Sequence, residues 1–363
     1  MSDKAIRLGL YGCGNRTRAL LNSVYGEGLY EVAAAFDIDA QKVKEVTERY
    51  GGKGCSSAEE LIKTKGIDAF IISLDPFAHP DAFDRTIEAG KPIYIEKPIA
   101  MSAERAYQML ERSREKNVPV HVGLMRRYEP QHVAARRFMK DNPPGRFFGI
   151  RCNWFHPGET EMLNCLFNQP DNFRLKVSQI PFHCCHALDV MRTYAGEVRR
   201  VEAMGIKWIE RQYPSPDNVI AVFEFENGSI GSFNYSSMSY KGELSYIIHC
   251  ENYTLTFENG LEIWYRPTTK FHREGEMLWS KKTGAGPWID CRPTYQKNIG
   301  PEKHVFVATS LPDDLAMKDF LGAVREGTPM KVTLEDGYKV AELAEAIETS
   351  YVQKKPIELP FTF

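Results

Sequence analysis

The stretch AIRLGLYGCGNRTRALL, residues 5–21, joins the pattern of a buried β-strand to the pattern of a helix. Between them, Gly12 permits a tight turn, and Gly14 lets the backbone approach a pyrophosphate that would lie at the N-terminus of the helix. A complete G-x-G-x-x-G motif has a third glycine for close packing of helix on strand, and this chain has Thr17 there. The motif is therefore incomplete, and the case for a dinucleotide depends on the sequence around it.

The next apolar strand pattern supplies a second feature of such a site. It ends in Asp37, 20 residues after Thr17. A carboxylate at this point can accept hydrogen bonds from the adenosine ribose hydroxyls. The alternative is that Asp37 caps the next helix, although Asp39 suits that position better. Since no arginine lies close to Asp37 to bind a 2′-phosphate, the sequence favours NAD over NADP.

The first 125 residues alternate between strand and helix patterns, which builds a parallel sheet with helices on both faces. The strand patterns lie at residues 5–12, 30–37, 67–74, 92–97 and 119–124. The helix patterns lie at residues 16–24, 40–50, 79–90 and 102–117, the last with Ser102 as its predicted N-cap. We therefore expect an α/β domain built on a parallel sheet.

The pattern changes after residue 125. Residues 218–237 and 246–265 each contain alternating apolar runs interrupted by Asn-Gly, a strong signal for a hairpin turn. Two amphipathic helix patterns close the chain, at residues 313–327 and 334–353. A length of 363 residues is sufficient for two cores. We predict a nucleotide-binding domain over residues 1–123 and a second domain, with a largely antiparallel sheet, over residues 124–363.

The composition limits the class of protein. Hydrophobic residues make up 43% of the chain and charged residues 26%, which is ordinary for a globular protein. A formal net charge of −2 argues against a nucleic-acid partner, which needs a basic surface. No apolar run reaches the ~18 residues of a membrane span, and the start has no signal-peptide core. The 8 cysteines are scattered without any Cys-x-x-Cys, so we expect reduced thiols in the cytoplasm.

A resemblance covers most of the chain. Glu96-Lys97-Pro98 follows a buried strand pattern in GKPIYIEKPIAMS (90–102). Together with the glycine loop, this segment resembles the Gfo/Idh/MocA family, which includes glucose–fructose oxidoreductase and inositol dehydrogenase. Other segments similar to that family are VGLMRRYEP (122–130), NFRL (172–175), CCHALDVMRTYAG (184–196) and the closing DFLGAVREGTPMKVTLEDGYKVAELAEAI (319–347).

The resemblance implies an N-terminal Rossmann domain and a C-terminal α/β domain whose large, mostly antiparallel sheet often mediates homodimers or homotetramers. It also implies an NAD(P)-dependent dehydrogenase or reductase that moves a hydride between the nicotinamide and a hydroxyl or keto carbon of a sugar, polyol or related compound. The substrate would lie between the domains. The residues expected to contact NAD are Gly12, Gly14, Asn15, Arg16, Asp37, Ser73, Leu74, His79, Glu96 and Lys97.

The resemblance points to Lys97 and His186 as catalytic residues. Oxidation of an alcohol requires removal of the hydroxyl proton as hydride leaves carbon. Lys97, at the carboxyl end of its strand, would stabilise the charge on the reacting oxygen, whereas without the resemblance it would be a surface lysine paired with Glu96. His186 matches the family's general acid/base. Pro181 suits the first turn of its helix, and a histidine near a helix N-terminus tends to stay neutral and able to accept a proton.

One departure from the family pattern concerns proton transfer. Many family dehydrogenases carry an Asp four residues before the histidine, whereas this chain has Phe182. Phenylalanine can neither accept a proton nor orient His186. Residues three apart are neighbours on a helix, so His183 can face the same side as His186, and we include it as a catalytic candidate. The alternative for His183 is a packing or hydrogen-bonding function.

A metal site is a weaker interpretation of the His-Cys-Cys-His run at residues 183–186. Adjacent cysteines diverge by ~100° on a helix, so they cannot join both histidines in one tetrahedral shell. A site with two histidines would need His156, Glu159 or Glu161 as further ligands. We therefore predict no metal.

The substrate contacts are expected to come from the second domain. Arg126 and Arg127 lie where relatives place substrate contacts and interdomain salt bridges, and the sequence leaves open which does which. The predicted substrate contacts are Arg126, Trp154, His156 and Tyr240, because aromatic faces stack on sugar C–H surfaces, although the last three could equally be core residues. His79 either lines the cofactor cleft or caps the helix that follows it.

Two other functions remain open from the sequence. The first is an NAD-retaining hydrolase or lyase that expels a leaving group after transient oxidation of a sugar, which the missing Asp leaves possible. The second is a nucleotide-binding regulator without catalysis, against which Glu96-Lys97-Pro98 and His186 argue.

Overall fold

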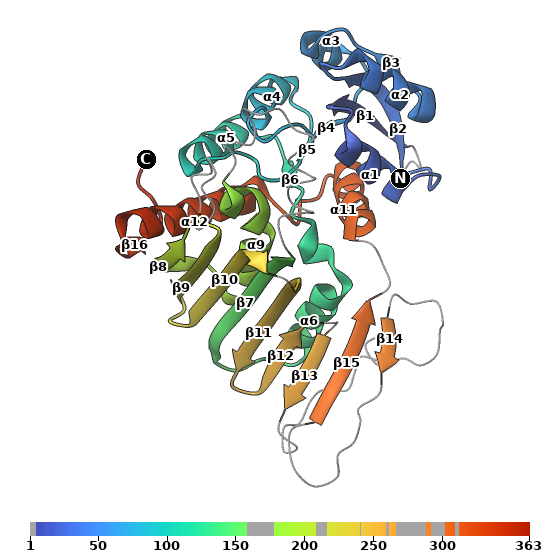
Figure 1. Cartoon of the computed structure of the whole chain (residues 1–363). Helices are drawn as coiled ribbons and strands as arrows, with labels where there is room; N and C mark the ends of the chain where they lie inside the picture. Colours follow the sequence, from blue (N-terminus) through green and yellow to red (C-terminus); the bar gives the residue numbers. More distant parts are fainter. Residues whose placement is uncertain are drawn as a thin grey trace. The chain divides into compact units, whose positions relative to one another are not determined.

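Figure 1 shows the computed structural model from which we describe the protein. The described residues are 5–157, 178–207, 216–239, 241–258, 261–265, 288–291, 302–308 and 312–363. Side chains are described throughout these ranges except at residues 156–157, 261–265, 288–291 and 302–308.

The chain divides into two compact units. The first contains residues 1–125 and 311–342 together with Phe363, and the second contains residues 126–310 and 343–362. Residues 311–342 thus pack with the first unit although they follow most of the second in sequence. None of the described helices is both long enough and apolar enough to cross a membrane.

The first unit is built on a six-stranded parallel sheet in the order β3-β2-β1-β4-β5-β6. Its strands are β1 (Ile6–Tyr11), β2 (Tyr30–Phe36), β3 (Lys53–Gly54), β4 (Ala69–Ile72), β5 (Ile93–Ile95) and β6 (Val120–Val122). The order reverses between β1 and β4, and in a doubly wound fold this point is where the carboxyl ends of the strands form a ligand crevice. The prediction of a parallel sheet with helices is confirmed.

The helices of this unit begin where the sequence places capping groups. They are α1 (Asn15–Ser23), α2 (Ala40–Tyr50), α3 (Ala58–Lys63), α4 (His79–Thr86), α5 (Ala103–Lys116) and α11 (Pro312–Glu326). Asp39, Ser57 and Ser102 each accept a hydrogen bond from a backbone N–H of the first turn, so the predicted cap at Ser102 and the preference for Asp39 over Asp37 are both confirmed. Helix α11 packs against α1 (Figure 1) and buries Met317, Phe320 and Leu321 in the same core.

The second unit is built on a ten-stranded sheet in the order β14-β15-β13-β12-β11-β7-β10-β9-β8-β16. Only the β7–β10 pair is parallel among the pairs described, so the prediction of a mostly antiparallel sheet is confirmed. The strands are β7 (Phe147–Pro157), β8 (Val198–Ile206), β9 (Asn218–Phe225), β10 (Ile230–Ser239), β11 (Glu243–Cys250), β12 (Tyr253–Phe257), β13 (Leu261–Tyr265), β14 (Trp288–Cys291), β15 (Glu302–Ala308) and β16 (Ile357–Glu358).

Helices cover one face of this sheet. Residues of α6 (Pro130–Asp141), of α9 (Cys185–Ala195) and of the end of α12 (Leu334–Gln353) share a core with alternate residues of the strands. In β9, Val219, Ala221 and Phe223 are buried in that core, whereas Ile220 and Val222 on the other face are exposed. The face opposite the helices, which we call the open face, thus carries exposed apolar side chains among the described residues.

Candidate functional site

The loop after β1 places two glycines at the point where the strand order reverses. Gly12 has a φ of +104°, and a Cβ there would lie 2.1 Å from the carbonyl oxygen of Ser73. Only glycine fits, because both the left-handed backbone and the close approach of the chain after β4 exclude a side chain. Thr17 takes the place of the third motif glycine, where it is buried and its hydroxyl donates a 2.8 Å hydrogen bond to the carbonyl of Gly12.

Gly14 lies at the N-cap of α1 and has different surroundings. Its φ of −72° suits any residue, and a Cβ there would meet no atom of the protein within 4 Å. No side chain caps the helix, although its first N–H groups lack intrahelical acceptors. Asn15, the first helical residue, is exposed, and its side chain accepts a hydrogen bond from Arg18. An open, uncapped N-terminus beside a glycine fits a bound pyrophosphate.

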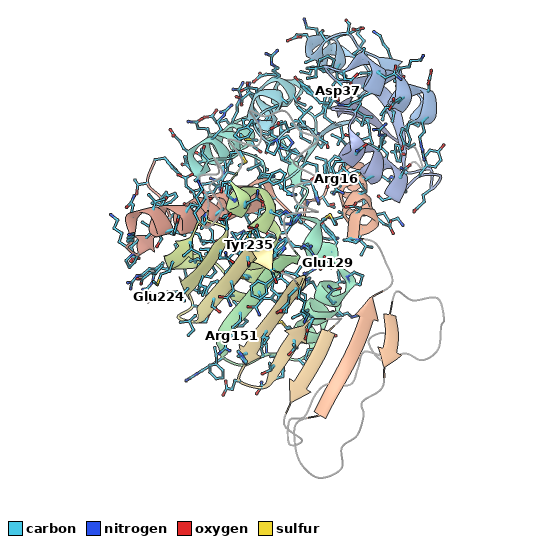
Figure 2. All side chains as sticks on the ribbon, in the orientation of Figure 1. Arg16, Asp37, Glu129, Arg151, Glu224 and Tyr235 are labelled. Atoms are coloured by element: carbon cyan, nitrogen blue, oxygen red, sulfur yellow. The ribbon has the colours of Figure 1, made fainter. Side chains whose placement is uncertain are left out.

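Asp37, labelled in Figure 2, directly follows β2 and is hydrogen-bonded to the same loop. Its Oδ2 accepts a 2.8 Å hydrogen bond from the N–H of Cys13, and its Oδ1 accepts one of 2.9 Å from Asp39. A carboxylate has about four acceptor positions, so two of them can still receive ribose hydroxyls. The next residue is Ile38, an apolar side chain that is 97% exposed, where a cofactor with a 2′-phosphate would be served by a cation. These features fit NAD better than a cofactor with a 2′-phosphate.

The residues after β4 complete this side of the crevice. The N–H of Ser73 donates to the carbonyl of Tyr11, and Ser73 is buried while Leu74 is partly exposed. Leu74 also donates its N–H to Nε2 of His79, at 3.1 Å.

His79 holds the neighbouring loop. Because its Nε2 accepts from Leu74, its Nδ1 carries the proton and donates to the carbonyl oxygen of Pro98 at 2.8 Å. The ring is fully buried, and burial lowers the pKa of His79 to about 4, so the imidazole is neutral at pH 7. Ala78, not His79, is the N-cap of α4. The contacts thus assign His79 to fixing the backbone directly after Lys97.

Glu96 fixes the backbone directly before Lys97. The Glu96 side chain is buried, and its Oε1 accepts hydrogen bonds from Nε of Arg16 at 2.8 Å and from the hydroxyl of Tyr94 at 3.3 Å. Its Oε2 accepts from the N–H of Lys97 at 3.3 Å. The side chain of Arg16, predicted to contact the cofactor, is directed to Glu96 and to Asp313 of α11. Lys97 itself is partly exposed.

In the second unit, His183 and His186 lie at a change of helix type. Residues Ile180–Cys184 form a π-helical turn with Pro181 in its first positions, and α9 begins at Cys185. Pro181 was predicted in the first turn, which is confirmed, but a regular α-helix through both histidines is wrong. Single π turns of this kind occur frequently at functional sites. Both histidines are partly exposed, whereas Cys184 and Cys185 are buried.

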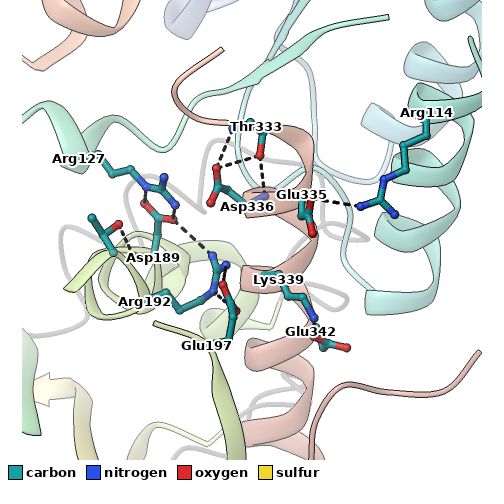
Figure 3. A network of polar contacts seen from close by, with 11 residues as sticks. Arg114, Arg127, Asp189, Arg192, Glu197, Thr333, Glu335, Asp336, Lys339 and Glu342 are labelled. Carbon is teal, nitrogen blue, oxygen red and sulfur yellow. Dashed lines mark hydrogen bonds and ion pairs between the residues drawn. The ribbon is translucent and has the colours of Figure 1, made fainter. Parts of the chain in front are cut away.

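An ion pair holds the helix of His186 (Figure 3). Nε and Nη2 of Arg127 both donate to the carboxylate of Asp189, with Nε at 2.7 Å from Oδ2. Asp189 is fully buried and lies three residues after His186, so the bidentate pair fixes α9 near that residue. Arg127 is therefore a structural residue of the second unit.

Arg126 has a different environment. Its guanidinium lies 5.0 Å from the centre of the Trp154 ring and donates a hydrogen bond to Glu129. The ring of His183 contacts the same indole edge-on, with centroids 5.0 Å apart. Trp154 is only 3% exposed, so its ring serves mainly as a support between Arg126 and His183. Of the two arginines, Arg126 is the one whose side chain is more exposed, 26% against 14%.

Some predicted residues lie beyond what the structure describes. Tyr240 is outside the described residues, and at His156 only the backbone is described, as the penultimate residue of β7. Glu159 and Glu161, named as further metal ligands, are also outside. Within the described residues there is no group of three or more His, Cys, Asp or Glu able to hold a metal ion.

Models of one protein family match both parts of the chain. A model described as an oxidoreductase family with an NAD-binding Rossmann fold matches residues 6–124, and the GFO/IDH/MocA C-terminal domain model matches residues 132–256. Together they span more than half of the 363 residues.

Similar proteins and structures agree with these matches. An inositol 2-dehydrogenase of Rhizobium meliloti is 23% identical over 367 residues, covering 98% of this chain and 99% of the relative. A levoglucosan dehydrogenase of Pseudarthrobacter phenanthrenivorans is 22% identical over 351 residues, or 87% and 86% of the two chains. A solved structure of levoglucosan dehydrogenase in complex with NADH superposes with a TM-score of 0.79 at 18% identity, covering 98% of this chain and 100% of that one. The WlbA dehydrogenase from Bordetella pertussis, in complex with NADH and UDP-GlcNAcA, gives 0.80 at 18% identity and covers both chains fully.

Proposed function

Because the chain belongs to the Gfo/Idh/MocA oxidoreductase family and its first domain is an NAD-binding Rossmann domain, we propose that it oxidises or reduces a sugar, polyol or related compound with NAD. The observation that carries the proposal is the arrangement around Lys97. Its backbone is fixed by Glu96 on one side and by His79, through Pro98, on the other. Lys97 follows β5, whose neighbour β4 borders the glycine loop at the carboxyl edge of the sheet.

Lys97 would act on the reacting oxygen. Bound NAD supplies the acceptor or donor of the hydride. As an alcohol is oxidised, negative charge develops on its oxygen, and a lysine ammonium held in a fixed position stabilises that charge by a hydrogen bond. A fixed backbone matters here because such stabilisation depends on donors that are already in place before the reaction.

His186 would transfer the hydroxyl proton, with His183 as a second candidate. Phe182 cannot take the part of the family Asp, since it has no group that binds a proton. The π turn positions His183 against Trp154, beside Arg126, which supports a function for this ring in orienting or binding substrate. Arg126 is accordingly the arginine that we propose as a substrate contact, and His156 and Tyr240 remain proposed contacts from the sequence.

The two predicted domains would have different functions. We propose that residues 1–123 bind NAD, with Asn15, Ser73 and Leu74 among the contacts, and that residues 124–363 supply the substrate site. Helix α11, which belongs to the first unit, would support the nucleotide-binding part although it lies in the second stretch of sequence.

A substrate panel tests the proposal. Purified protein with NAD+ and a series of inositols, aldoses and anhydrosugars should form NADH, measured by absorbance. Lys97→Met should lower kcat by about 10²–10⁴-fold while NADH binding changes little. Lys91→Met, on the exposed residue before the same strand, is the matched control and should behave as the wild type.

Three outcomes would count against a dehydrogenase. Tight NADH binding without turnover of any compound in the panel would refute the proposed reaction. Glycoside cleavage without net NADH formation would instead show the NAD-retaining hydrolase or lyase. A cofactor-dependent change in affinity for a protein partner, with no turnover, would show a regulator.

The open face of the second sheet supports self-association. It carries exposed apolar residues, among them Met204 at 79%, Ile220 at 60% and Ile230 at 65%, next to the charged side chains Arg151 and Glu224 (Figure 2). Exposed apolar side chains gathered on one face mark interaction sites, and we propose that a second copy of the chain covers this face in a homodimer or homotetramer.

Light scattering on size-exclusion peaks tests this assembly. Ile220→Asp combined with Ile230→Asp should reduce the mass to that of one chain, because two carboxylates would be buried in the interface. Val352→Asp, on an equally exposed apolar residue of α12, should leave the mass unchanged. A monomeric wild type would refute the proposal.

We also propose that the protein works in the cytoplasm. Among the described cysteines, Cys13, Cys55, Cys152 and Cys250 are buried free thiols. Burial raises the pKa of Cys13 to about 12, so this thiol is unreactive as well as unpaired. Reduced cysteines of this kind suit a reducing compartment.

A further inference from the structure

An ion-paired arginine links α11 to the loop of Lys97. Nη1 and Nη2 of Arg16 donate to the two carboxylate oxygens of Asp313 at 2.7 and 2.8 Å. Nε of the same guanidinium donates to Glu96 at 2.8 Å. The pair Arg16–Asp313 joins positions 297 residues apart, and both lie in the first unit. Arg16 therefore bridges two carboxylates from different parts of the chain.

The bridge continues to the backbone of Lys97. Glu96 is only 4% exposed, and its two oxygens accept from Arg16 and Tyr94 on one side and from the N–H of Lys97 on the other. A buried carboxylate needs a paired cation, because leaving it uncompensated is costly. The orientation of the Glu96 carboxylate, and so the acceptor offered to Lys97, depends on where the guanidinium of Arg16 is held.

Asp313 determines where that guanidinium is held. A planar guanidinium that binds one carboxylate through Nε can still swing about that bond, whereas a bidentate pair on its other edge fixes its plane. The Arg16 side chain is 32% exposed and that of Asp313 is 18% exposed, so the pair is partly shielded from solvent. Asp313 is thus the anchor of the bridge on the side away from Glu96.

We propose that Asp313 is a positioning residue for Lys97, acting through Arg16 and Glu96. The inference rests on the proposed function, because it gives Lys97 the catalytic part stated above. It adds a residue of α11, outside the glycine loop and the Glu96-Lys97-Pro98 segment, to the set on which the reaction depends.

A simpler explanation for Asp313 is provided by its place in the helix. Acidic residues in the first turn stabilise a helix through its dipole, and Asp313 and Asp314 both lie there. Asp314 pairs instead with Lys318, at 2.7 Å, whereas the carboxylate that binds Arg16 is that of Asp313. Asp314→Asn therefore removes the same charge from the same helical turn without touching the bridge, and it is the matched control.

The test compares Asp313→Asn, Asp313→Glu and Asp314→Asn in the full-length protein. Hydrogen exchange of the peptide spanning residues 95–100 needs no substrate, and Asp313→Asn should speed it at least fivefold. With a substrate from the panel, kcat should fall about tenfold while the KM and the NADH Kd change less than threefold, since a misplacement of ~1 Å can cost up to ~10²-fold. Asp313→Glu should recover most of kcat, and Asp314→Asn should match the wild type.

A double-mutant cycle tests whether Asp313 acts through Arg16. In an Arg16→Gln background, Asp313→Asn should change neither exchange nor kcat further. If Asp313→Asn does not fold, Arg16→Lys serves in its place and should reproduce the faster exchange. Lysine keeps the charge but lacks the planar guanidinium that binds Asp313 through two N–H groups and Glu96 through a third.

The inference is overturned if Asp313→Asn and Asp314→Asn exchange alike, if exchange rises while kcat stays at the wild-type value, or if Asp313→Glu is as impaired as Asp313→Asn. A wild type without turnover on the panel would refute the proposed function instead. Exchange in the variants would still decide whether Asp313 holds the loop.

Discussion

Replacing Gly12 and Gly14 separately by alanine should separate the stability of the first unit from its affinity for NAD. The two glycines belong to one loop, but a Cβ on Gly12 would lie 2.1 Å from the carbonyl oxygen of Ser73, whereas a Cβ on Gly14 would meet nothing within 4 Å. We therefore expect Gly12→Ala to act on folding and Gly14→Ala to act on binding.

For Gly12→Ala we expect a loss of at least about 3 kcal/mol in the free energy of unfolding. A φ of +104° is unfavourable for an L-residue, at a cost of about 1–3 kcal/mol. The contact with Ser73 adds to this, because the atom in the way is a backbone carbonyl oxygen, and the N–H of the same residue is held by a hydrogen bond to the carbonyl of Tyr11. For a unit of this size, each kcal/mol lowers Tm by ~2–4 °C, so a fall of about 6 °C or more is expected.

For Gly14→Ala the effects on stability nearly cancel. Alanine is a poorer N-cap than glycine by up to ~1 kcal/mol. The lower entropy of the unfolded alanine chain offsets about 0.4–1 kcal/mol of that loss, since the φ of −72° is accessible to alanine. The methyl group would instead fill the space through which the pyrophosphate approaches α1, so NADH affinity should fall at least tenfold, or ~1.4 kcal/mol.

Thermal unfolding without cofactor and NADH titration by fluorescence measure the two effects on the same samples. Wild-type NADH affinity in Gly14→Ala would show that the pyrophosphate does not lie on this loop. A Tm drop in Gly14→Ala as large as that in Gly12→Ala would show that the space around Gly14 is not open in the folded protein.

Three further variants have expected outcomes. Asp37→Ser with Ile38→Arg should exchange the ribose acceptor for a phosphate ligand, so the ratio of NADP to NAD affinity should rise at least tenfold in a titration; an unchanged ratio would place the ribose elsewhere. His79→Gln should reduce the pH dependence of the free energy of unfolding between pH 6.5 and 4, by up to ~1.4 kcal/mol per pH unit, the value for one proton. In this range the unfolded histidine binds a proton, whereas the folded one, with a pKa of about 4, stays neutral. The wild type therefore loses stability as the pH falls. If the free energy of unfolding, measured by denaturant titration at several pH values, changes equally with pH in the wild type and in His79→Gln, this prediction is contradicted. Asp189→Asn should cost about 3–5 kcal/mol, measured by denaturant unfolding, because it leaves the charge of Arg127 without its buried partner; a loss below 1 kcal/mol would show that the pair is not required.

The features that the sequence predicted correctly depend on neighbours in the chain. Period-2 runs separated by Asn227-Gly228 gave the β9–β10 hairpin, and Asp39 and Ser102 were recognised as caps because capping uses residues within one turn. Helix α3 and the short strand β3 were not predicted, since a helix of 6 residues and a strand of 2 leave too little periodicity. The π turn before α9 was also missed, because no local pattern distinguishes it from an α-helical start.

The site was predicted less completely, because its polar groups are fixed by residues far away in sequence. Arg16 was assigned to the cofactor from its place in the glycine loop, which stays a prediction, and the sequence did not show that its side chain pairs with Glu96 and Asp313. His79 was expected to touch the cofactor or cap a helix. The cap is Ala78, and the two ring nitrogens of His79 join Leu74 to Pro98, while its contact with the cofactor stays a prediction. Motif spacing shows which residues reach the site, but it does not show which of their side-chain atoms already bind other residues of the protein.

Contacts with residues far away in sequence also distinguish Arg126 from Arg127. Adjacent residues of one charge are equivalent in sequence, and a 3-10 turn at Met125–Tyr128 sends their side chains in different directions. Arg127 finds the fully buried carboxylate of Asp189, which needs a cation, whereas Arg126 rests on the face of Trp154 with the larger exposed fraction. The buried acid thus identifies Arg127 as the structural arginine, and Arg126 is the one that we propose as a substrate contact. Glu96 is likewise a buried acid that needs a cation, whereas Lys97 is partly exposed. That cation is Arg16, and Asp313 holds Arg16. This is how, in our proposal, a residue far away in sequence affects the position of Lys97.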